Sequence, residues 1–135
     1  MTPLACMALA ASFYHLPPRV LPSIHAVEGG APGVVVLDAN GTQDLGVMQI
    51  NSVWVPPLAA YTRLSPAEVR SRLINQSCFN IAAAGAILRA YLRETRGDLM
   101  QAIGDYHSHT PLLNRTYQIA VESAATRLFI LHRRG

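Results

Sequence analysis

The sequence predicts a mainly α-helical domain of the α+β class, with one small β element near residues 31–50. Apolar residues recur at helical spacing over most of the chain, and prolines and glycines stand where helices begin and end. Residues 31–50 depart from this pattern with a β-branched run and turn residues. The chain has 135 residues, half of them hydrophobic, so we expect a single domain over residues 1–135 that buries a core.

The first helix is predicted over residues 1–14, where Leu4, Met7, Ala8 and Ala11 recur at helical spacing. This stretch is apolar, but it lacks the basic residues that precede the hydrophobic region of a signal peptide. If the protein is exported, we therefore expect its signal peptide to be already absent from this sequence. No apolar run approaches about eighteen residues, so no transmembrane helix is predicted.

A second helix is predicted from Pro18 to Glu28, since proline fits the first turn of a helix and two glycines follow the end. The residues expected on its buried side are Val20, Leu21, Ile24 and Val27. The β-branched run at 34–36, the turn at 38–41 and Gly46 then predict two short strands or an irregular hairpin.

Four further helices follow. The capping-box pattern at residues 65–68 begins the first, and residues 80–95 form the second. Asp98, with Gln101 three residues later, starts a short third helix, and Pro111 opens the last. The face expected to be buried on the second helix is Ile81, Ala84, Gly85, Leu88, Tyr91 and Leu92. On the last helix it is Leu112, Ile119, Ala120, Ala124, Leu128 and Leu131.

The charged residues exclude a disordered chain and argue against a dedicated nucleic-acid-binding protein. Only 14% of the residues are charged, against roughly 25% in an average soluble protein, which excludes a disordered chain. All 11 basic residues are arginine and the net charge is +3. Because the arginines are scattered, no nucleic-acid binding is predicted. Arg133 and Arg134 stand together, and they fit a solvated tail and a partner-binding segment equally well.

Glu28 is the acidic residue that a purely structural role explains least well. It lies one helical turn after Ile24, at the C-terminal end of an apolar helix. The helix dipole there disfavours a negative charge, and apolar neighbours would desolvate the carboxyl group. Both effects raise its pKa, which suits a general acid near neutral pH. Exposed glutamates are nevertheless common at helix ends. Most other acids fit helix caps, solvent-exposed faces or turns, so no partner carboxylate stands out.

The histidines and cysteines do not form a familiar motif. His107 and His109 are expected in a loop, and no third ligand stands at a recognisable spacing, so we predict no metal site. No phosphate-binding glycine loop or nucleophile elbow occurs, and we predict no cofactor. Cys6 and Cys78 are either two buried thiols or one disulfide formed in an oxidising compartment.

Five patches, taken in their order and spacing, point to one family. They are Cys6 and the segments 24–30 (IHAVEGG), 40–51 (NGTQDLGVMQIN), 78–88 (CFNIAAAGAIL) and 102–108 (AIGDYHS). In this combination the chain resembles the soluble lytic transglycosylase family, whose catalytic domain has the goose-type lysozyme-like fold. The resemblance extends from Cys6 to about Tyr117. It is strongest to the small members that accompany secretion and conjugation machines, and it implies a disulfide between Cys6 and Cys78.

The resemblance implies cleavage of the β-1,4 bond between N-acetylmuramic acid and N-acetylglucosamine in peptidoglycan. Glu28 would first protonate the glycosidic oxygen. It would then take a proton from the muramoyl C6 hydroxyl as that oxygen attacks C1. The product is a 1,6-anhydro sugar and no water is consumed, unlike the two-carboxylate pattern of most glycosidases.

The same resemblance assigns further residues to the substrate. Met48 and Gln49 are expected to line the groove, and Tyr106 to reach toward Glu28 or the sugar. Asn51 and His107 complete the predicted substrate-binding set, although Asn51 and Asn80 also fit structural roles. Trp54 fits stacking on a sugar and filling the core equally well.

Two positions depart from the family pattern. Gly29 stands where serine is usual after the glutamate, and His107 stands where asparagine usually follows the tyrosine. Either change would alter how the acetamide group or the transition state is held. Two alternatives therefore remain, a hydrolytic lysozyme on the same fold and a weakly active peptidoglycan-binding scaffold.

The resemblance also implies where the protein acts and what it meets there. We expect a periplasmic monomer whose partner is the peptidoglycan glycan strand. Components of a type III or type IV secretion, conjugation or pilus system are the expected protein partners.

Overall fold

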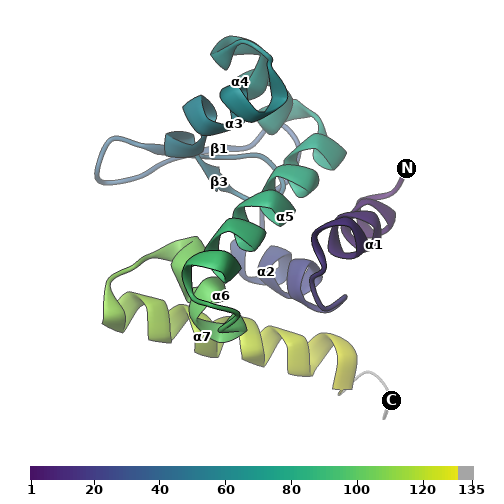
Figure 1. Cartoon of the computed structure of the whole chain (residues 1–135), viewed down its shortest axis with the longest axis vertical. Helices are drawn as coiled ribbons and strands as arrows, with labels where there is room; N and C mark the ends of the chain where they lie inside the picture. The colour runs from purple at the N-terminus through teal and green to yellow at the C-terminus, as the bar shows by residue number, and fades with distance from the viewer. Residues whose placement is uncertain (131–135) are drawn as a thin grey trace.

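The computed structural model describes residues 1–130, and it confirms the mainly α-helical fold with a small sheet (Figure 1). The α-helices are α1 (Pro3–Tyr14), α2 (Val20–Glu28), α3 (Val55–Thr62), α4 (Pro66–Asn75), α5 (Ser77–Glu94), α6 (Leu99–His107) and α7 (Pro111–Ala125). Short helical segments follow β3 and α7, namely η1 (Ser52–Trp54) and η2 (Thr126–Ile130). Arg133, Arg134 and Leu131, to which the sequence assigned roles, lie outside the described residues.

The sheet is antiparallel and has the order β1 (Val35–Leu37), β2 (Gln43–Leu45), β3 (Ile50–Asn51). In its register Leu45 is opposite Val35 on one side and Ile50 on the other. The turn predicted at residues 38–41 joins the first two strands, so the predicted hairpin is confirmed and extended by a third strand.

Helix α5 lies centrally in the molecule and contacts α1, α2, α4 and α6 (Figure 1). The sheet, α3 and α4 lie toward one of its ends, and α6 and α7 toward the other. The face of α5 predicted to be buried is correct except that Tyr91 is only partly buried. Within residues 1–130, no helix is long and apolar enough to cross a membrane.

The predicted helix starts are confirmed by their caps. The Ser65 hydroxyl accepts a hydrogen bond from the Glu68 amide at 3.1 Å, and the Asp98 carboxylate accepts one from the Gln101 amide at 3.1 Å. Helix α2 begins at Val20, two residues later than predicted, and ends where expected, with Gly29 in the left-handed conformation (φ +66°).

The buried faces of the first and last helices differ from the prediction. On α1 Met7 and Ala11 are buried, but Leu4 is exposed, and so is Ala8. On α7 Leu112 and Ile119 are exposed, whereas the buried residues are Asn114, Tyr117, Val121 and Ala124. The apolar pattern was misleading on α7 because this helix turns two polar side chains inward, where they make hydrogen bonds.

Candidate active site

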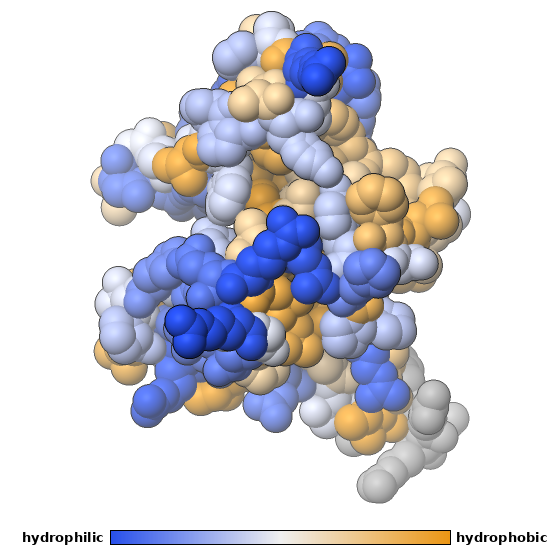
Figure 2. Space-filling model, viewed as in Figure 1, coloured by the Kyte–Doolittle hydropathy of each residue, from blue (hydrophilic) through white to orange (hydrophobic). Residues whose placement is uncertain are grey.

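A cavity of about 410 Å³ lies between the sheet and α6. Its walls come from the strands and their turn on one side and from α6 and the loop after it on the other. Figure 2 shows the surface hollowed on the left, between the upper and lower parts of the molecule. The lining residues are Glu28, Asp38, Asn40, Asp44, Gln49, Ile50, Asn51, Val53, Trp54, Ile87, Tyr91, Asp105, Tyr106, His107, Ser108 and His109.

Glu28 is the last residue of α2, and close backbone packing holds that helix end beside the sheet. A Cβ atom on Gly30 would lie 2.2 Å from the Gly46 carbonyl oxygen and 2.6 Å from that of Val47. Only glycine permits this approach. Gly46 itself is at φ +70°, and a Cβ there would lie 2.0 Å from the Leu73 carbonyl oxygen. Two glycines therefore bring the Glu28 segment, the turn at residues 46–49 and the end of α4 together.

The carboxyl group of Glu28 is half-buried and titrates near neutral pH. Desolvation by burial is the largest influence and raises its pKa to about 7, and the nearby charges of Asp44 and Asp38 raise it further. The Tyr117 hydroxyl donates a hydrogen bond to Glu28 Oε1 at 2.9 Å, which favours the charged form and opposes the rise. At neutral pH a substantial fraction of Glu28 therefore holds a proton that it can donate.

Tyr117 is a site residue that the sequence did not single out. Its pKa lies well above the usual value, first because it is buried and then because Glu28 is close, so it remains a hydrogen-bond donor. The His107 ring stacks on the Tyr117 ring, with centroids 4.9 Å apart and an interplanar angle of 11°. His107 lines the cavity, as the prediction requires of a substrate-binding residue.

Asn114 fixes the α7 segment that carries Tyr117. Its side-chain amide donates to Asp105 Oδ1 at 2.9 Å and to the Ser108 carbonyl at 3.0 Å. A Cβ on Gly104 would lie 2.0 Å from Asn114 Oδ1, so glycine at this position leaves the space that the Asn114 side chain occupies. Because Tyr117 is three residues after Asn114, it is held on the same face of α7.

Met48 takes a position that differs from the prediction, and it is hydrogen-bonded to Tyr106. The Tyr106 hydroxyl donates to the Met48 carbonyl at 2.8 Å, whereas the hydroxyl bonded to Glu28 is that of Tyr117. Met48 is fully buried and is not among the residues that line the cavity. Its side chain enters the core because its backbone is fixed by Asn80, whose side-chain oxygen accepts from the Met48 amide at 2.9 Å. Tyr106 still lines the cavity.

Gln49 lines the cavity, as predicted, in the left-handed conformation (φ 53°). Its side-chain nitrogen donates to the Gly46 carbonyl at 3.0 Å. Among residues 1–130 nothing donates to its side-chain oxygen, which leaves that atom to accept a hydrogen bond from a ligand.

Asn51 joins two aspartates that the sequence did not identify as site residues. Its side-chain nitrogen donates to Asp38 Oδ2 and to Asp44 Oδ1, each at 3.2 Å. Burial and then the adjacent Asp38 raise the pKa of Asp44 to about 6, and the Asn51 hydrogen bond lowers it. A pair of carboxyl groups, Asp38 and Asp44, therefore lies in the cavity with Glu28. Residue spacing did not reveal it because these aspartates meet only through the strand pairing.

Trp54 packs against the core and also lines the cavity. It contacts Tyr91 edge to face, with ring centroids 5.7 Å apart. The residue is only half-buried, so part of its ring remains exposed beside the cavity.

Glu94, Asp105 and His109 form a cluster of possible metal ligands, and two of them, Asp105 and His109, also line the cavity. Their potential ligand atoms all lie within 4.8 Å of one another, a convergence that the sequence did not predict. His109 Nε2 lies 3.3 Å from Glu94 Oε1 and 3.8 Å from Asp105 Oδ2. Asp105 is also hydrogen-bonded by Asn114, so contacts within the protein account for all three groups.

The predicted disulfide between Cys6 and Cys78 is present, with Cα atoms 5.4 Å apart. It links α1 to the first turn of α5 and is compatible with an oxidising compartment. No model of a known protein family matches the chain, and no curated protein matches it either.

Proposed function

We propose that this protein is a peptidoglycan lytic transglycosylase acting in the periplasm, where it opens the wall locally for an envelope-spanning machine. The observation that carries the proposal is Glu28, a half-buried carboxyl group with a pKa of about 7 in an open polar cavity. A group with this pKa can both donate and accept a proton at neutral pH. The non-hydrolytic reaction requires a single carboxyl group to do both.

In the proposed reaction Glu28 donates its proton to the glycosidic oxygen as the bond from C1 breaks. The muramoyl C6 hydroxyl then attacks C1, and the Glu28 carboxylate accepts the proton of that hydroxyl. The bond lost is the glycosidic C–O bond, the bond gained is the 1,6-anhydro bond, and the carboxyl group ends protonated as it began. Tyr117 supports both states because it holds the carboxyl group in one orientation.

Sugar binding is proposed for the polar groups around Glu28. The Gln49 side-chain oxygen and the His107 ring both line the cavity and suit hydroxyl and acetamide groups. Trp54 offers a ring face to a sugar. Gly29 replaces the serine usual in the family, and a Cβ at this position would meet nothing within 4 Å.

The test is to incubate purified peptidoglycan with the wild type and with Glu28→Gln, and to analyse the products by mass spectrometry. We expect anhydro-muropeptides from the wild type and at least a hundredfold less from Glu28→Gln, in line with the loss of a general acid. Glu122→Gln is the matched control, because Glu122 is exposed on α7 and outside the cavity. Absence of products from the wild type would overturn the proposal.

Asp44 favours one alternative, a hydrolytic lysozyme on the same fold. Its carboxylate lines the cavity with Glu28 and could activate a water molecule, as the second acid of most glycosidases does. The same mass spectra decide between the two reactions, since a hydrolysed muramoyl end contains one water more than the anhydro end. Hydrolytic products that disappear in Asp44→Asn would establish the lysozyme.

A further inference from the structure

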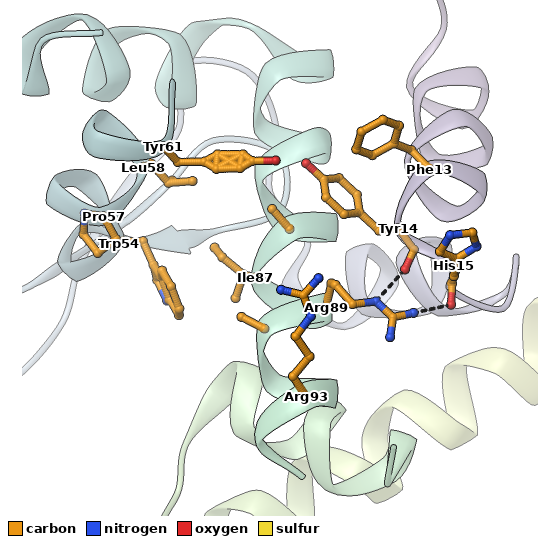
Figure 3. Close-up of a pocket in the computed structure, with 12 residues that line it drawn as sticks. Phe13, Tyr14, His15, Trp54, Pro57, Leu58, Tyr61, Ile87, Arg89 and Arg93 are labelled. Atoms are coloured by element: carbon orange, nitrogen blue, oxygen red, sulfur yellow. Dashed lines mark hydrogen bonds between the residues drawn. The ribbon is translucent and has the colours of Figure 1, made fainter. Parts of the chain in front are cut away.

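A second groove, of about 500 Å³, lies directly beside the candidate active site. Figure 3 shows it over α5, between α3 and the end of α1. Trp54 and Ile87 line both this groove and the cavity that contains Glu28. Trp54 and Ile87 are therefore a wall common to both, and the two depressions are close enough to be considered as parts of one extended site.

The two depressions differ in charge. Four acidic residues line the cavity at Glu28, whereas none lines the second groove, which is lined by Arg89, Arg93 and His15. The groove is therefore complementary to an anion, and the neighbouring cavity is not.

The two arginines are arranged to receive a ligand. Arg89 donates from Nε to the Tyr14 carbonyl at 2.8 Å and from Nη2 to the His15 carbonyl at 2.7 Å, which fixes its guanidinium at the end of α1. Arg93 is exposed one turn later on α5, and its side chain runs back along the helix toward Arg89 (Figure 3). Within residues 1–130 neither guanidinium has an acidic partner. Arg93 is thus available for a carboxylate.

The remaining walls suit a peptide. Phe13, Tyr14, Trp54 and Tyr61 supply aromatic surface, and the hydroxyl groups of Tyr14 and Tyr61 point toward one another across the groove (Figure 3). Aromatic rings with polar ends bind peptide side chains and backbone groups together. A bare sugar chain would leave the two arginines without a partner.

We propose that this groove binds the carboxylate-bearing stem peptide that branches from the muramoyl sugar, while the glycan occupies the cavity at Glu28. This inference rests on the proposed function, because it assigns the ligand of the same extended site. Arg93 is the specificity residue, and it pairs with a carboxylate of the peptide. Arg89 positions the end of α1 and adds positive charge.

The cleavage test compares peptidoglycan that carries stem peptides with glycan strands from which an amidase has removed them. We expect the wild type to cleave the peptide-bearing strands faster. In Arg93→Gln this preference should fall by about fivefold, the value of one exposed ion pair. Arg115→Gln is the matched control, since Arg115 is exposed on α7 and lines neither depression.

The outcomes separate the two proposals. If the wild type cleaves both substrates equally, or if Arg93→Gln keeps the full preference, the stem-peptide site is wrong and the proposed function stands. If the wild type releases no products from either substrate, the proposed function is wrong.

A direct binding test uses Trp54, the only tryptophan of the chain, as a fluorescent reporter in the groove. The free stem tetrapeptide should change its emission in the wild type and more weakly in Arg93→Gln, whereas a tetrapeptide with amidated carboxyl groups should not. No change in the wild type would overturn the inference. Equal binding of an unrelated acidic peptide would also overturn it, in favour of a partner protein.

Discussion

The Glu28 carboxyl group is under opposing influences that leave it between its two protonation states at neutral pH. Burial and the neighbouring aspartates favour the neutral form, while the Tyr117 hydroxyl favours the charged form. A carboxyl group without that hydrogen bond would hold its proton more firmly and give it up less readily. The Tyr117 hydroxyl therefore adjusts the pKa of Glu28. A phenylalanine at this position would remove the hydroxyl and keep the ring.

Tyr117→Phe should move the alkaline limit of activity to higher pH. The variant loses the hydroxyl that donates to Glu28 Oε1. Because this hydrogen bond lowers the Glu28 pKa, its loss should raise that pKa. A pH profile of kcat/KM on purified peptidoglycan measures the shift. An alkaline limit that stays in place or moves to lower pH would show that Tyr117 does not tune Glu28.

Glu28→Gln should stabilise the protein at alkaline pH relative to acid pH. The folded protein holds the Glu28 proton until about pH 7, whereas the unfolded chain releases it near 4.5. The unfolded state thus binds fewer protons between these values, so this group makes the free energy of unfolding fall as pH rises through the window. Glutamine removes the effect.

The expected size, allowing for the partial exposure of Glu28, is about 2 kcal/mol between pH 4 and pH 8. Urea unfolding of wild type and variant across this range measures it. Glu122→Gln, a substitution on the exposed face of α7 outside the cavity, is the control for removing one carboxyl group. A difference between wild type and Glu28→Gln that stays constant with pH would mean that the Glu28 pKa is ordinary in the folded protein.

Sequence reasoning reached Glu28 but not Tyr117, Asp38 or Asp44, for a physical reason. A carboxyl group at the end of an apolar helix has a predictable environment, because the helix supplies both the dipole and the apolar side chains. Tyr117 is 89 residues from Glu28, and it meets Glu28 only through packing between helices. Asp38 and Asp44 come together only through strand pairing and the Asn51 side chain.

The elements around the site are joined by Asn80, a fully buried residue in the first turns of α5. Its side-chain nitrogen donates to the Leu45 and Leu73 carbonyls, both at 2.8 Å, and its oxygen accepts from the Met48 amide. One side chain thus holds β2, the following turn and α4 in place. The sequence allowed a structural role for Asn80, and these contacts provide it.

Asn80→Ala should lower the free energy of unfolding by about 3 kcal/mol, since three buried backbone groups lose their partner. Urea denaturation measures the loss. Asn75→Ala is the control, because Asn75 is exposed and makes one hydrogen bond within α4, to the Ser71 carbonyl at 3.0 Å. Equal small effects of the two substitutions would contradict the role given to Asn80.

Helix ends were easier to predict than helix faces. Caps depend on residues three apart, so Ser65 and Asp98 were identified correctly as starting points. The buried face of a helix depends on which neighbours it meets. On α7 those neighbours accept hydrogen bonds from Asn114 and Tyr117, and the apolar Leu112 and Ile119 face outward.

At the scale of the whole molecule, the disulfide connects the N-terminal helix to the central one. Cys6 is buried on α1, and Cys78 stands at the start of α5. Helix α5 contacts α1, α2, α4 and α6, and its Ile87 and Tyr91 line the cavity. The covalent link between α1 and α5 also helps to hold the second groove in shape, because Phe13 and Tyr14 at the end of α1 form part of its wall.

Reduction of the disulfide should destabilise the protein by about 4 kcal/mol, because opening a loop of this length restores conformational entropy to the unfolded chain. The cysteines are separated by 72 positions, so the loop includes the sheet, α2, α3 and α4. Urea unfolding with and without reductant measures the change. The double variant Cys6→Ser, Cys78→Ser should unfold at the midpoint of the reduced wild type and be insensitive to reductant. An unchanged wild-type midpoint, in a sample whose mass confirms full reduction, would show that packing of α1 on α5 holds the helices without the bond.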